Sequence, residues 1–300
     1  MQVSIIIVNY NTKDLLRDCL KTIISYTQEI EYEIIVSDNG SSDDSVEMLK
    51  KEFSSVIVLE NNKNLGFGTA NNKALEIASG KYVLYLNSDT VLCNNAVKDF
   101  FDYMEAHINE NIGAIGTNLM DNKKNIIHSF GRFPSFLSLT KILIRDNISQ
   151  FLKLILHMLC IKKEHFTNST SEAAFYTGNV DYITGADLFL KNDENAKFDE
   201  KFFLYYEETD LQKTMSKKGL ERRIIDGPQI IHLEGGSNNT NGKKFTSFGN
   251  LISYISMVYY CKKNISKSGA ILLKILILLL WLNPLHLKNT KKFFRKLFEI

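Results

Sequence analysis

Cysteine is scarce in this chain of 300 residues, and no two of its four cysteines form a CxxC pair: Cys19, Cys93, Cys160 and Cys261. Such isolated cysteines argue against a zinc site or a disulfide framework, and they are typical of a reducing compartment. The patterns GxGxxG and GxxxxGK followed by Ser or Thr are also missing, which disfavours a dinucleotide-dependent enzyme and a P-loop NTPase. A sugar-phosphate nucleotidyltransferase is disfavoured as well. The first predicted strand leads into Asn9-Tyr10-Asn11-Thr12-Lys13 instead of a glycine-rich segment with Arg or Lys.

The sequence also has little net charge and few long apolar runs. The net charge is only +2, but residues 262–300 contain nine Lys and Arg against one acidic residue, so this tail carries +8 and residues 1–261 carry −6. The apolar run 271–282 contains Lys274, and it is shorter than the ~20 residues that span a bilayer. We therefore expect an interfacial helix that attaches to an anionic membrane surface. A helix that packs within the protein or against a partner is the alternative.

Apolar runs and helical spacings alternate over the first ninety residues. The run 3–8 is mostly β-branched, as expected of a strand buried on both faces. It has no basic leader or cleavage site, so we expect a first core strand of a cytosolic protein and not a signal peptide. Alternation across short loops predicts an α/β fold with a doubly wound, mostly parallel, Rossmann-like sheet. The predicted strands are 3–8, 33–37, 56–59 and 82–86, with helices at 15–24, 46–53 and 68–78 between them.

After Thr90 the pattern is less regular. We predict strands at 112–117 and 181–190, and a helical extension from Asn250 to the end of the sequence. Between the two strands, residues 136–166 are apolar with scattered Lys and Arg. This segment is predicted to be a helical lid, an acceptor platform, a membrane-facing insertion or a buried helix, and the sequence leaves these alternatives open.

Three polar clusters are set at the ends of predicted strands. Asp38-Asn39-Gly40-Ser41-Ser42 follows 33–37, Asn87-Ser88-Asp89 follows 82–86, and His232 follows the short apolar run 229–231. In open α/β sheets, ligands bind outside the carboxyl ends of the strands. Carboxylates and a histidine carried to that edge therefore predict a nucleotide-plus-metal site.

Each cluster has a chemical and a structural interpretation. Asp38 can accept the imide N–H of a uracil or thymine ring, or its cluster can simply cap a helix. Asp89, alone or with Asn87, can hold a hard divalent ion whose remaining ligands are diphosphate and water. His232 can be a metal ligand beside Asp89. A loop carboxylate and a structural histidine are the alternatives.

Two further segments have the composition of a site. In the stretch from Asn64 through Gly66 to Asn72, small residues let the backbone approach a ligand, and a helix N-terminus favours phosphate. A plain turn and cap is the alternative. Glu207 and Glu208 follow an aromatic run, and apolar surroundings raise the pKa of a carboxyl group, as a general base near neutral pH requires. Acidic first-turn residues that complement a helix dipole are the alternative.

With these residues identified, the chain resembles family-two glycosyltransferases of the GT-A fold, and in pattern the bacterial rhamnosyltransferase-like branch. The resemblance extends from about Val3 to Lys263. Its pieces are the segments 3–11, 38–43, 64–72, 86–90, 185–186 and 203–211, and the pattern His232-x-x-Gly235-x-Ser237.

The resemblance implies roles for these positions. Glu208 is implied as the base that deprotonates the acceptor, with Glu207 beside it, and Mg²⁺ or Mn²⁺ is implied as the cofactor. The implied metal ligands are Asp89, His232 and Asn87, and the implied donor-binding residues are Asn9, Asp38, Asn39, Asn64, Gly66, Asn72 and Ser88. Two positions depart from the family pattern: Glu208 replaces the usual Asp, and Asn87 replaces an acidic residue found in many relatives.

The implied activity is inverting transfer of a sugar from dTDP-rhamnose or a UDP-hexose to a lipid-linked or growing cell-surface glycan, of the O-antigen or capsule type. We expect a catalytic domain at 1–249, with a nucleotide-binding half at 1–90 and an acceptor half at 91–249, and a membrane-associating tail at 250–300. The expected location is peripheral, on the cytoplasmic face of the membrane. No nucleic acid partner is expected, and a homodimer is left open.

A non-catalytic relative that acts as a membrane-bound scaffold for glycan assembly is the alternative function. The presence of Asp89, Glu208 and His232 argues against it, because a scaffold has no need of a metal ligand set or a base.

Overall fold

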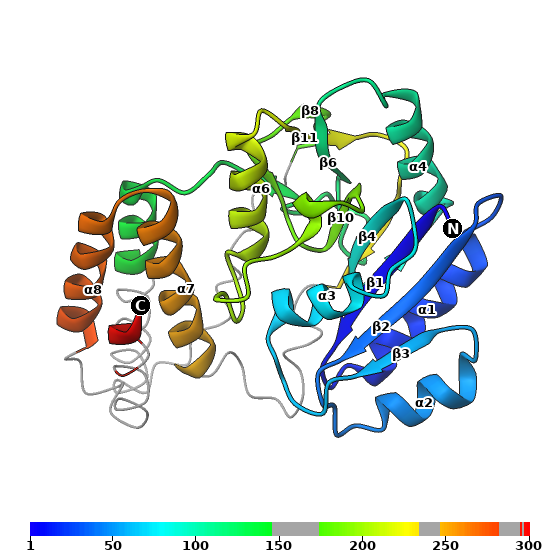
Figure 1. Cartoon of the computed structure of the whole chain (residues 1–300), viewed down its shortest axis with the longest axis horizontal. Coiled ribbons are helices and arrows are strands. Elements are labelled where there is room, and N and C mark those ends of the chain that lie inside the picture. The colour runs from blue at the N-terminus through cyan, green and yellow to red at the C-terminus, as the bar shows by residue number, and fades with distance from the viewer. Residues whose placement is uncertain (146–173, 234–246, 282–294, 296) are drawn as a thin grey trace. The chain divides into compact units, whose positions relative to one another are not determined.

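The computed structural model describes residues 1–145, 174–233, 247–281, 295 and 297–300. The chain divides into two compact units: Met1–Phe133 with Glu172–Lys244, and Pro134–Ser171 with Phe245–Ile300. The described residues of the first unit form a mixed α/β structure, and those of the second unit are mainly helical (Figure 1).

Within the described residues, eight strands of the first unit form one sheet in the order β3-β2-β1-β4-β10-β6-β11-β8. The neighbours β3, β2, β1 and β4 are parallel, as are β6 and β11. β10 runs antiparallel between β4 and β6, and β8 is antiparallel to β11. The prediction of a mostly parallel GT-A-type α/β sheet is therefore confirmed. The strands of this sheet are β1 (Val3–Asn9), β2 (Tyr32–Asp38), β3 (Ile57–Glu60), β4 (Tyr82–Asn87), β6 (Ile112–Thr117), β8 (Gly178–Asn179), β10 (Asp187–Lys191) and β11 (Glu221–Ile225).

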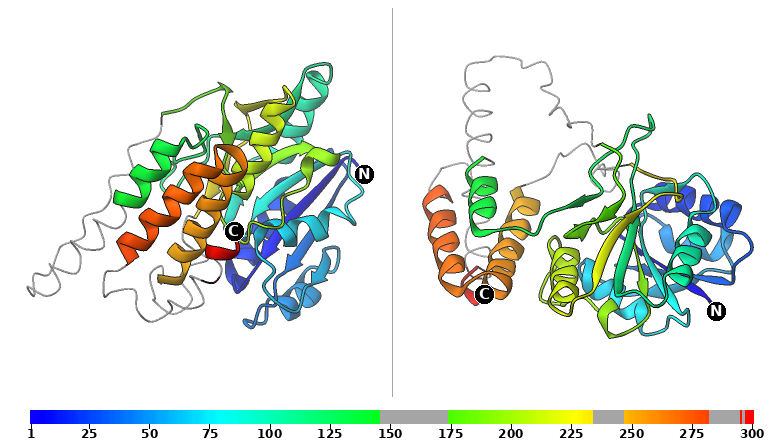
Figure 2. Two further views of the ribbon diagram at one scale, coloured as in Figure 1. Left: turned by 60° about the vertical axis from the view of Figure 1, so that its left-hand side comes forward. Right: turned by 90° about the horizontal axis from the view of Figure 1, so that it is seen from above.

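Helices cover both faces of this sheet because the central strands are apolar on both sides. In β1, Ile5 and Ile7 belong to one apolar cluster and Ile6 to another. The first cluster includes residues of α1, α2 and α4, and the second includes residues of α3 and α6. Figure 2 shows α6 on one side of the sheet and α1 and α4 on the other. The helices are α1 (Lys13–Tyr26), α2 (Ser45–Glu52), α3 (Phe67–Leu75), α4 (Ala96–Ala106) and α6 (Glu207–Lys217), with a 3₁₀ turn η1 (Glu194–Ala196).

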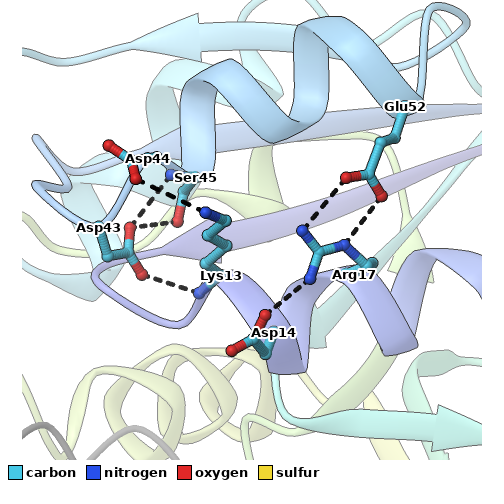
Figure 3. A network of polar contacts seen from close by, with 7 residues as sticks. All are labelled: Lys13, Asp14, Arg17, Asp43, Asp44, Ser45 and Glu52. Carbon is cyan, nitrogen blue, oxygen red and sulfur yellow. Dashed lines mark hydrogen bonds and ion pairs between the residues drawn. The ribbon is translucent and has the colours of Figure 1, made fainter.

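Polar side chains join the N-terminal ends of α1 and α2 (Figure 3). The carboxylate of Asp43 accepts hydrogen bonds from the backbone N–H of Lys13 at 2.9 Å and from the backbone N–H of Ser45 at 3.2 Å. One carboxylate thus satisfies orphan N–H groups of two helices, where the helix dipole favours negative charge. Arg17 pairs with Glu52 at 2.8 Å farther along, but this exposed pair contributes little to stability because solvent screens it. Asp43 therefore helps to orient the first two helices behind the edge where β1 and β2 end.

The predicted strand 181–190 is wrong as a single element. It is divided into β9 (Tyr182–Ile183) and β10, and β9 pairs with β7 (Phe130–Gly131) in a separate two-stranded sheet. The chain joins the main sheet only after Thr184, whose N–H donates to the carbonyl of Ser129 at 2.9 Å. Local pattern cannot show such a change of partner, because both strands are largely buried.

The described part of the second unit contains α7 (Ser247–Asn264), α8 (Lys267–Trp281) and a helix at 136–145. Its buried side chains include Leu139 of the first of these helices in chain order, Val258 of α7 and Leu273 of α8. The rest of the segment 136–166, from residue 146 on, lies outside the described residues. Among the described residues, no helix is both long and apolar enough to cross a membrane.

Candidate functional site

Four side chains from the ends of β1, β2 and β4 and the start of α1 form one hydrogen-bonded network. The Asn9 amide donates to Asp38 Oδ1 at 2.8 Å and accepts a bond from the Thr12 hydroxyl at 2.6 Å. The hydroxyls of Thr12 and Ser88 lie 2.9 Å apart. The structure thus places the predicted donor-binding residues Asn9, Asp38 and Ser88 together at the carboxyl edge of the sheet, as parallel pairing of these strands requires. Thr12, which was not among the predicted site residues, connects them.

Asp38 also shapes the turn that follows it. Its Oδ2 atom accepts the backbone N–H groups of Gly40 at 3.0 Å and Ser41 at 2.9 Å, and the residue is only 2% exposed. Both carboxylate oxygens therefore already accept hydrogen bonds within the protein. A carboxylate oxygen has two lone pairs, so Oδ1, with one partner among the described residues, retains capacity for a ligand N–H.

The loop before α3 packs on the protein itself. Asn39 donates to the carbonyl of Gly66 at 3.0 Å, and Asn64 accepts the backbone N–H of Gly66 at 2.9 Å. A Cβ atom at position 66 would lie 2.1 Å from the carbonyl oxygen of Phe203. The absence of a side chain at position 66 thus allows the segment that leads into α6 to approach closely. This contact of Gly66 lies within the protein, whereas the sequence predicts a contact with the ligand.

Asn72 has a comparable role in α3. Its amide accepts the backbone N–H of Phe198 at 2.8 Å and donates to the Phe198 carbonyl at 2.9 Å and to Glu200 at 3.1 Å. Asn72 is 1% exposed, and these three hydrogen bonds hold α3 to the chain segment that follows η1. The structure therefore does not join Asn72 to the polar network around Asp38.

The three predicted metal ligands converge. The Nε2 atom of His232 lies 3.2 Å from Oδ1 of Asp89 and 3.4 Å from Nδ2 of Asn87, although His232 and Asn87 are 145 residues apart in the chain. The side chains of His232 and Asp89 are 16% and 7% exposed. This group of residues, Asn87, Asp89 and His232, is called the β4 cluster below.

His232 reaches this cluster by a route that the sequence does not show. It is the last residue of β12 (Ile230–His232), which pairs antiparallel with β5 (Thr90–Leu92) outside the main sheet, with His232 opposite Thr90. The backbone N–H of Leu233 donates to the carbonyl of Asp89 at 2.9 Å. The histidine is thus fastened beside Asp89 by backbone pairing. The Gly235 and Ser237 positions of the predicted pattern lie outside the described residues.

The donor set of the β4 cluster fits a divalent ion that obtains most of its ligands elsewhere. Asp89 offers a carboxylate and His232 an imidazole. Rotation of the Asn87 amide by half a turn makes its oxygen available as well. The 3.2 Å separation of His232 and Asp89 is close to the ~3.0 Å between adjacent ligands of an octahedral ion with bonds of ~2.1 Å. Among the described residues, no group of three or more His, Cys, Asp and Glu exists that could enclose a metal by itself. The fit is therefore to Mg²⁺ or Mn²⁺ held jointly with a diphosphate, and a closed metal site is not formed.

Glu207 and Glu208 form the first turn of α6, and both carboxyl groups have raised pKa values. Burial is the main cause at Glu207, which is 3% exposed and whose Oε2 has no hydrogen-bond partner among the described atoms, and the charge of Glu208 adds to it. Burial also raises the pKa of the half-buried Glu208. Two adjacent acids with raised pKa values are a place where a proton can be held or accepted near neutral pH.

The backbone before these acids is strained. Tyr205 and Tyr206 have φ of +71° and +69°, the left-handed region that aromatic residues rarely adopt. Burial and the charge of Glu207 raise the pKa of Tyr205 to about 12, so its hydroxyl stays protonated beside that acid. Strain of about 1–3 kcal/mol per residue is sustained only where surrounding contacts enforce it, and it is concentrated at functional sites.

Two adjacent residues join this acid pair to the β4 cluster. The carbonyl of Ala186 accepts the backbone N–H of Asn87 at 3.1 Å. Gly185 lies directly before it, and a Cβ there would be 3.6 Å from the Cβ of Glu208. The connection between β9 and β10 thus hydrogen-bonds Asn87 of the β4 cluster and lies beside Glu208 of the acid pair.

Two buried polar residues near this connection were not singled out by the sequence. Gln212 of α6 accepts the N–H of Ile183 at 2.8 Å and donates to its carbonyl at 2.7 Å, which fastens the acid-bearing helix to β9. Asp187, the first residue of β10, is fully buried, accepts the N–H of Thr117 at 2.7 Å and leaves Oδ1 without a partner among the described atoms. The only sequence signal for Asp187 is a polar residue directly before the apolar run 188–190, and the polar sequence around Gln212 offers no such signal.

Comparison with known proteins assigns this arrangement to a family. The family model described as Glycosyl transferase family 2 matches residues 4–157. The chain is 36% identical over 108 residues to the poly(ribitol-phosphate) beta-glucosyltransferase of Bacillus spizizenii, a match that covers 34% of this chain and 17% of that protein. It is also 36% identical over 104 residues to the UDP-Glc:alpha-D-GlcNAc-diphosphoundecaprenol beta-1,3-glucosyltransferase WfaP of Escherichia coli, with coverage of 34% and 41%. The matched region is thus less than half of either relative.

Solved structures share the fold at low sequence identity. S. aureus TarS 1–349 in complex with UDP-GlcNAc aligns with a TM-score of 0.52 and 14% identity, over 100% of this chain and 79% of that one. A structure of GalNAc-T7 with UDP, GalNAc and Mn²⁺ aligns with a TM-score of 0.57 and 13% identity, over 89% of this chain and 51% of that one.

Proposed function

This chain belongs to glycosyl transferase family 2, and we propose that it transfers a sugar from a nucleoside-diphosphate donor to a cell-surface glycan with inversion at the anomeric carbon. The observation that carries the proposal is the position of the Gly185-Ala186 connection, which bonds Asn87 through Ala186 and lies beside Glu208 at Gly185. A base for an acceptor hydroxyl and ligands for a metal diphosphate are the two groups that such a transfer requires.

A UDP-hexose is the proposed donor. The two curated relatives are beta-glucosyltransferases by name, and one name specifies UDP-Glc. The free lone pair of Asp38 Oδ1 is suited to the imide N–H of uracil, and the backbone turn that Asp38 holds is suited to the ribose. A thymine ring presents the same imide, so dTDP-rhamnose is the competing donor, as the resemblance to the rhamnosyltransferase-like branch suggests.

The β4 cluster is the proposed holder of Mg²⁺ or Mn²⁺, through Asp89, His232 and Asn87. When bound, the metal neutralises charge that develops on the leaving diphosphate. The GalNAc-T7 structure of the same fold, a complex with UDP, GalNAc and Mn²⁺, supports this proposal.

Glu208 is the proposed general base. As a carboxylate it accepts the proton of the acceptor hydroxyl while that oxygen attacks the anomeric carbon and the bond to the diphosphate breaks. One displacement of this kind inverts the anomeric centre. The raised pKa makes Glu208 a stronger base than an exposed carboxylate, and the pKa of Glu207 next to it is raised as well. The non-catalytic scaffold alternative gives no reason for a buried carboxyl group with an unpartnered oxygen at this place.

The proposed acceptor is a lipid-linked or growing glycan, in line with the poly(ribitol-phosphate) and diphosphoundecaprenol acceptors that the relatives' names specify. Such an acceptor requires a location at a membrane, and we propose peripheral attachment on its cytoplasmic face. The division into a catalytic domain at 1–249 and a membrane-associating tail at 250–300 is part of the same proposal.

A ligand screen followed by product analysis tests the function. Thermal unfolding is measured with UDP, dTDP, GDP and CMP, each with and without Mn²⁺, because a ligand of the native state raises Tm by mass action. We expect metal-dependent stabilisation by UDP. A shift with dTDP alone would replace the donor by dTDP-rhamnose. No shift with any nucleotide, together with no hydrolysis or transfer from UDP-hexoses, would favour the scaffold alternative. The anomeric configuration of the product, read by NMR, tests inversion.

A further inference from the structure

One side of α8 is an exposed aliphatic stripe. Ile271, Leu272, Ile275 and Leu279 are 57%, 55%, 47% and 62% exposed, whereas Ala270, Leu273 and Ile277 of the same helix are at most 2% exposed. At ~100° per residue, the four exposed residues fall within about 100° of the helix circumference. The buried three fall on the opposite side. The helix therefore packs by one face and presents a second apolar face outward.

This stripe is larger than the scattered exposed apolar residues of an ordinary surface. Single exposed leucines need no explanation, but four large aliphatic side chains in adjacent positions mark a contact surface. In the described part of the second unit, Leu137, Ile144, Ile265 and Phe298 are exposed in addition.

Positive charge accompanies the stripe. The described residues of the second unit contain seven Lys and Arg against a single acid, Glu299, which pairs with Arg295 at 3.0 Å. On α8, Lys267 precedes Ile271 by one helical turn and Lys274 follows it by one, so both basic residues border the stripe on the same edge. The pKa of the Lys274 ammonium is lowered by burial and further by the charge of Lys262, which shows that two like charges are close together here. Such a concentration of positive charge favours an anionic partner.

An apolar stripe with a basic border is the pattern of an interfacial helix. Such a helix lies between the headgroups and the acyl chains of a bilayer, with its apolar side chains among the acyl chains and its long Lys side chains reaching the phosphates.

We infer that α8 is the membrane-contacting element of this chain, with Ile271, Leu272, Ile275 and Leu279 entering an anionic bilayer and Lys267 and Lys274 on its headgroups. The inference deepens the proposed peripheral location by naming the surface and the lipid charge. It does not require transfer activity, so lipid binding and sugar transfer succeed or fail separately.

Vesicle co-sedimentation of the full chain tests the inference. Vesicles of phosphatidylcholine alone and of phosphatidylcholine with about 30 mol% anionic phosphatidylglycerol are compared at low and high salt. We expect at least tenfold stronger binding to the anionic vesicles, weakened by salt because screening reduces the attraction of Lys to the headgroups. Equal binding to both vesicle types, or no binding to either, would overturn the inference.

Matched variants separate the stripe from general apolar exposure. The double variant I271Q/L279Q should bind anionic vesicles at least tenfold more weakly, and K267Q/K274Q should lose most of the preference for them. In the first unit, I57Q and I77Q remove side chains of 42% and 46% exposure and should bind like the unchanged chain. Circular dichroism and Tm confirm that each variant is folded.

A second copy of the chain is the competing occupant of the stripe. Light scattering after size exclusion measures the mass of the unchanged chain and of I271Q/L279Q. If the stripe joins two copies, the variant becomes monomeric while vesicle binding is absent in both, and the inference is wrong. UDP-dependent thermal stabilisation, measured on the same samples, reports the donor site independently of the outcome.

Discussion

The carbonyl oxygen of Phe203 lies where any residue other than glycine at position 66 would carry its side chain: an ideal Cβ on Gly66 would be 2.1 Å from this oxygen. The same oxygen accepts the N–H of Phe67 at 2.9 Å, and Gly66 has a φ of +87°. The start of α3 and the strained segment that leads to Glu207 and Glu208 are therefore in direct backbone contact.

We predict that Gly66→Ala destabilises the fold by about 2–4 kcal/mol, because left-handed strain and a backbone clash add together. Gly219→Ala is the control. Gly219 has a similar φ of +75°, but nothing lies within 4 Å of a Cβ there, so only about 1 kcal/mol is expected. Chemical denaturation measures both. Equal costs at the two positions would contradict the importance of the Phe203 contact.

Removing a member of the β4 cluster should abolish the response to metal. Asp89→Ala should lower transfer by at least about a hundredfold and eliminate the Mn²⁺-dependent part of the UDP-induced rise in Tm, and His232→Gln should weaken both about ten- to a hundredfold. Chelation by EDTA should reproduce the Asp89→Ala result in the unchanged chain. His107→Gln, at the end of α4, is the control and should respond to Mn²⁺ normally. Metal-independent transfer in the unchanged chain would refute the metal assignment.

The two acids at the start of α6 should differ in their sensitivity to replacement. Glu208→Gln should lower transfer by about 10²–10⁴ without loss of UDP binding, because an amide cannot accept the proton. Glu207→Gln should retain activity within about tenfold, since burial and the charge of Glu208 raise the pKa of Glu207 and so favour its neutral form, which Gln resembles.

The pH dependence follows from the same pair. A base must be ionised, so transfer by the unchanged chain should increase as the pH rises through the raised pKa of Glu208, whose main cause is burial. Steady-state rates measured from pH 5 to 9 provide the profile. An active Glu208→Gln variant, or a rate that does not vary over this range, would exclude Glu208 as the base.

Asp187 should make the fold less stable at high pH. Burial raises its pKa well above the ordinary value, so the folded protein retains a proton that the unfolded chain releases above about pH 4. The stability due to this proton is complete below the unfolded pKa and is lost as the pH rises through the folded pKa. Asp187→Asn retains an oxygen for the Thr117 N–H and should be more stable than the unchanged chain by about 1–3 kcal/mol at pH 8, with a smaller difference at pH 5.

Asp121→Asn provides a control of opposite sign. Hydrogen bonds from Asn125 lower the pKa of Asp121, so its contribution is present above the unfolded pKa and is lost as the pH falls through the folded one. Its replacement should destabilise the protein at pH 8 and have less effect near pH 3. Urea unfolding across this range measures both variants, and a destabilised Asp187→Asn protein at pH 8 would show that Asp187 is ionised in the fold.

Much of the first half of the fold is predictable from local pattern. The strands near 3–8, 33–37 and 82–86 and the polar residues directly after them are found close to where the periodicity predicts them. This works because a central parallel strand is buried on both faces, and an unbroken β-branched run has few other stable environments. The convergence of Asn9, Asp38 and Ser88 then follows from parallel pairing alone.

The sequence by itself thus determined the α/β class, the family and the sheet edge on which Asp38 and Asp89 lie. Only the tertiary structure decided that β9 pairs with β7 outside the main sheet and that pairing of β12 with β5 brings His232 beside Asp89. It also decided that the Phe203 carbonyl packs against Gly66. Local periodicity indicates whether a residue is buried, but it does not indicate which residues pack against it. Partners distant in the chain are determined by the requirement that all buried backbone and side-chain polar groups form hydrogen bonds, as at Gln212. This requirement applies only in the folded chain.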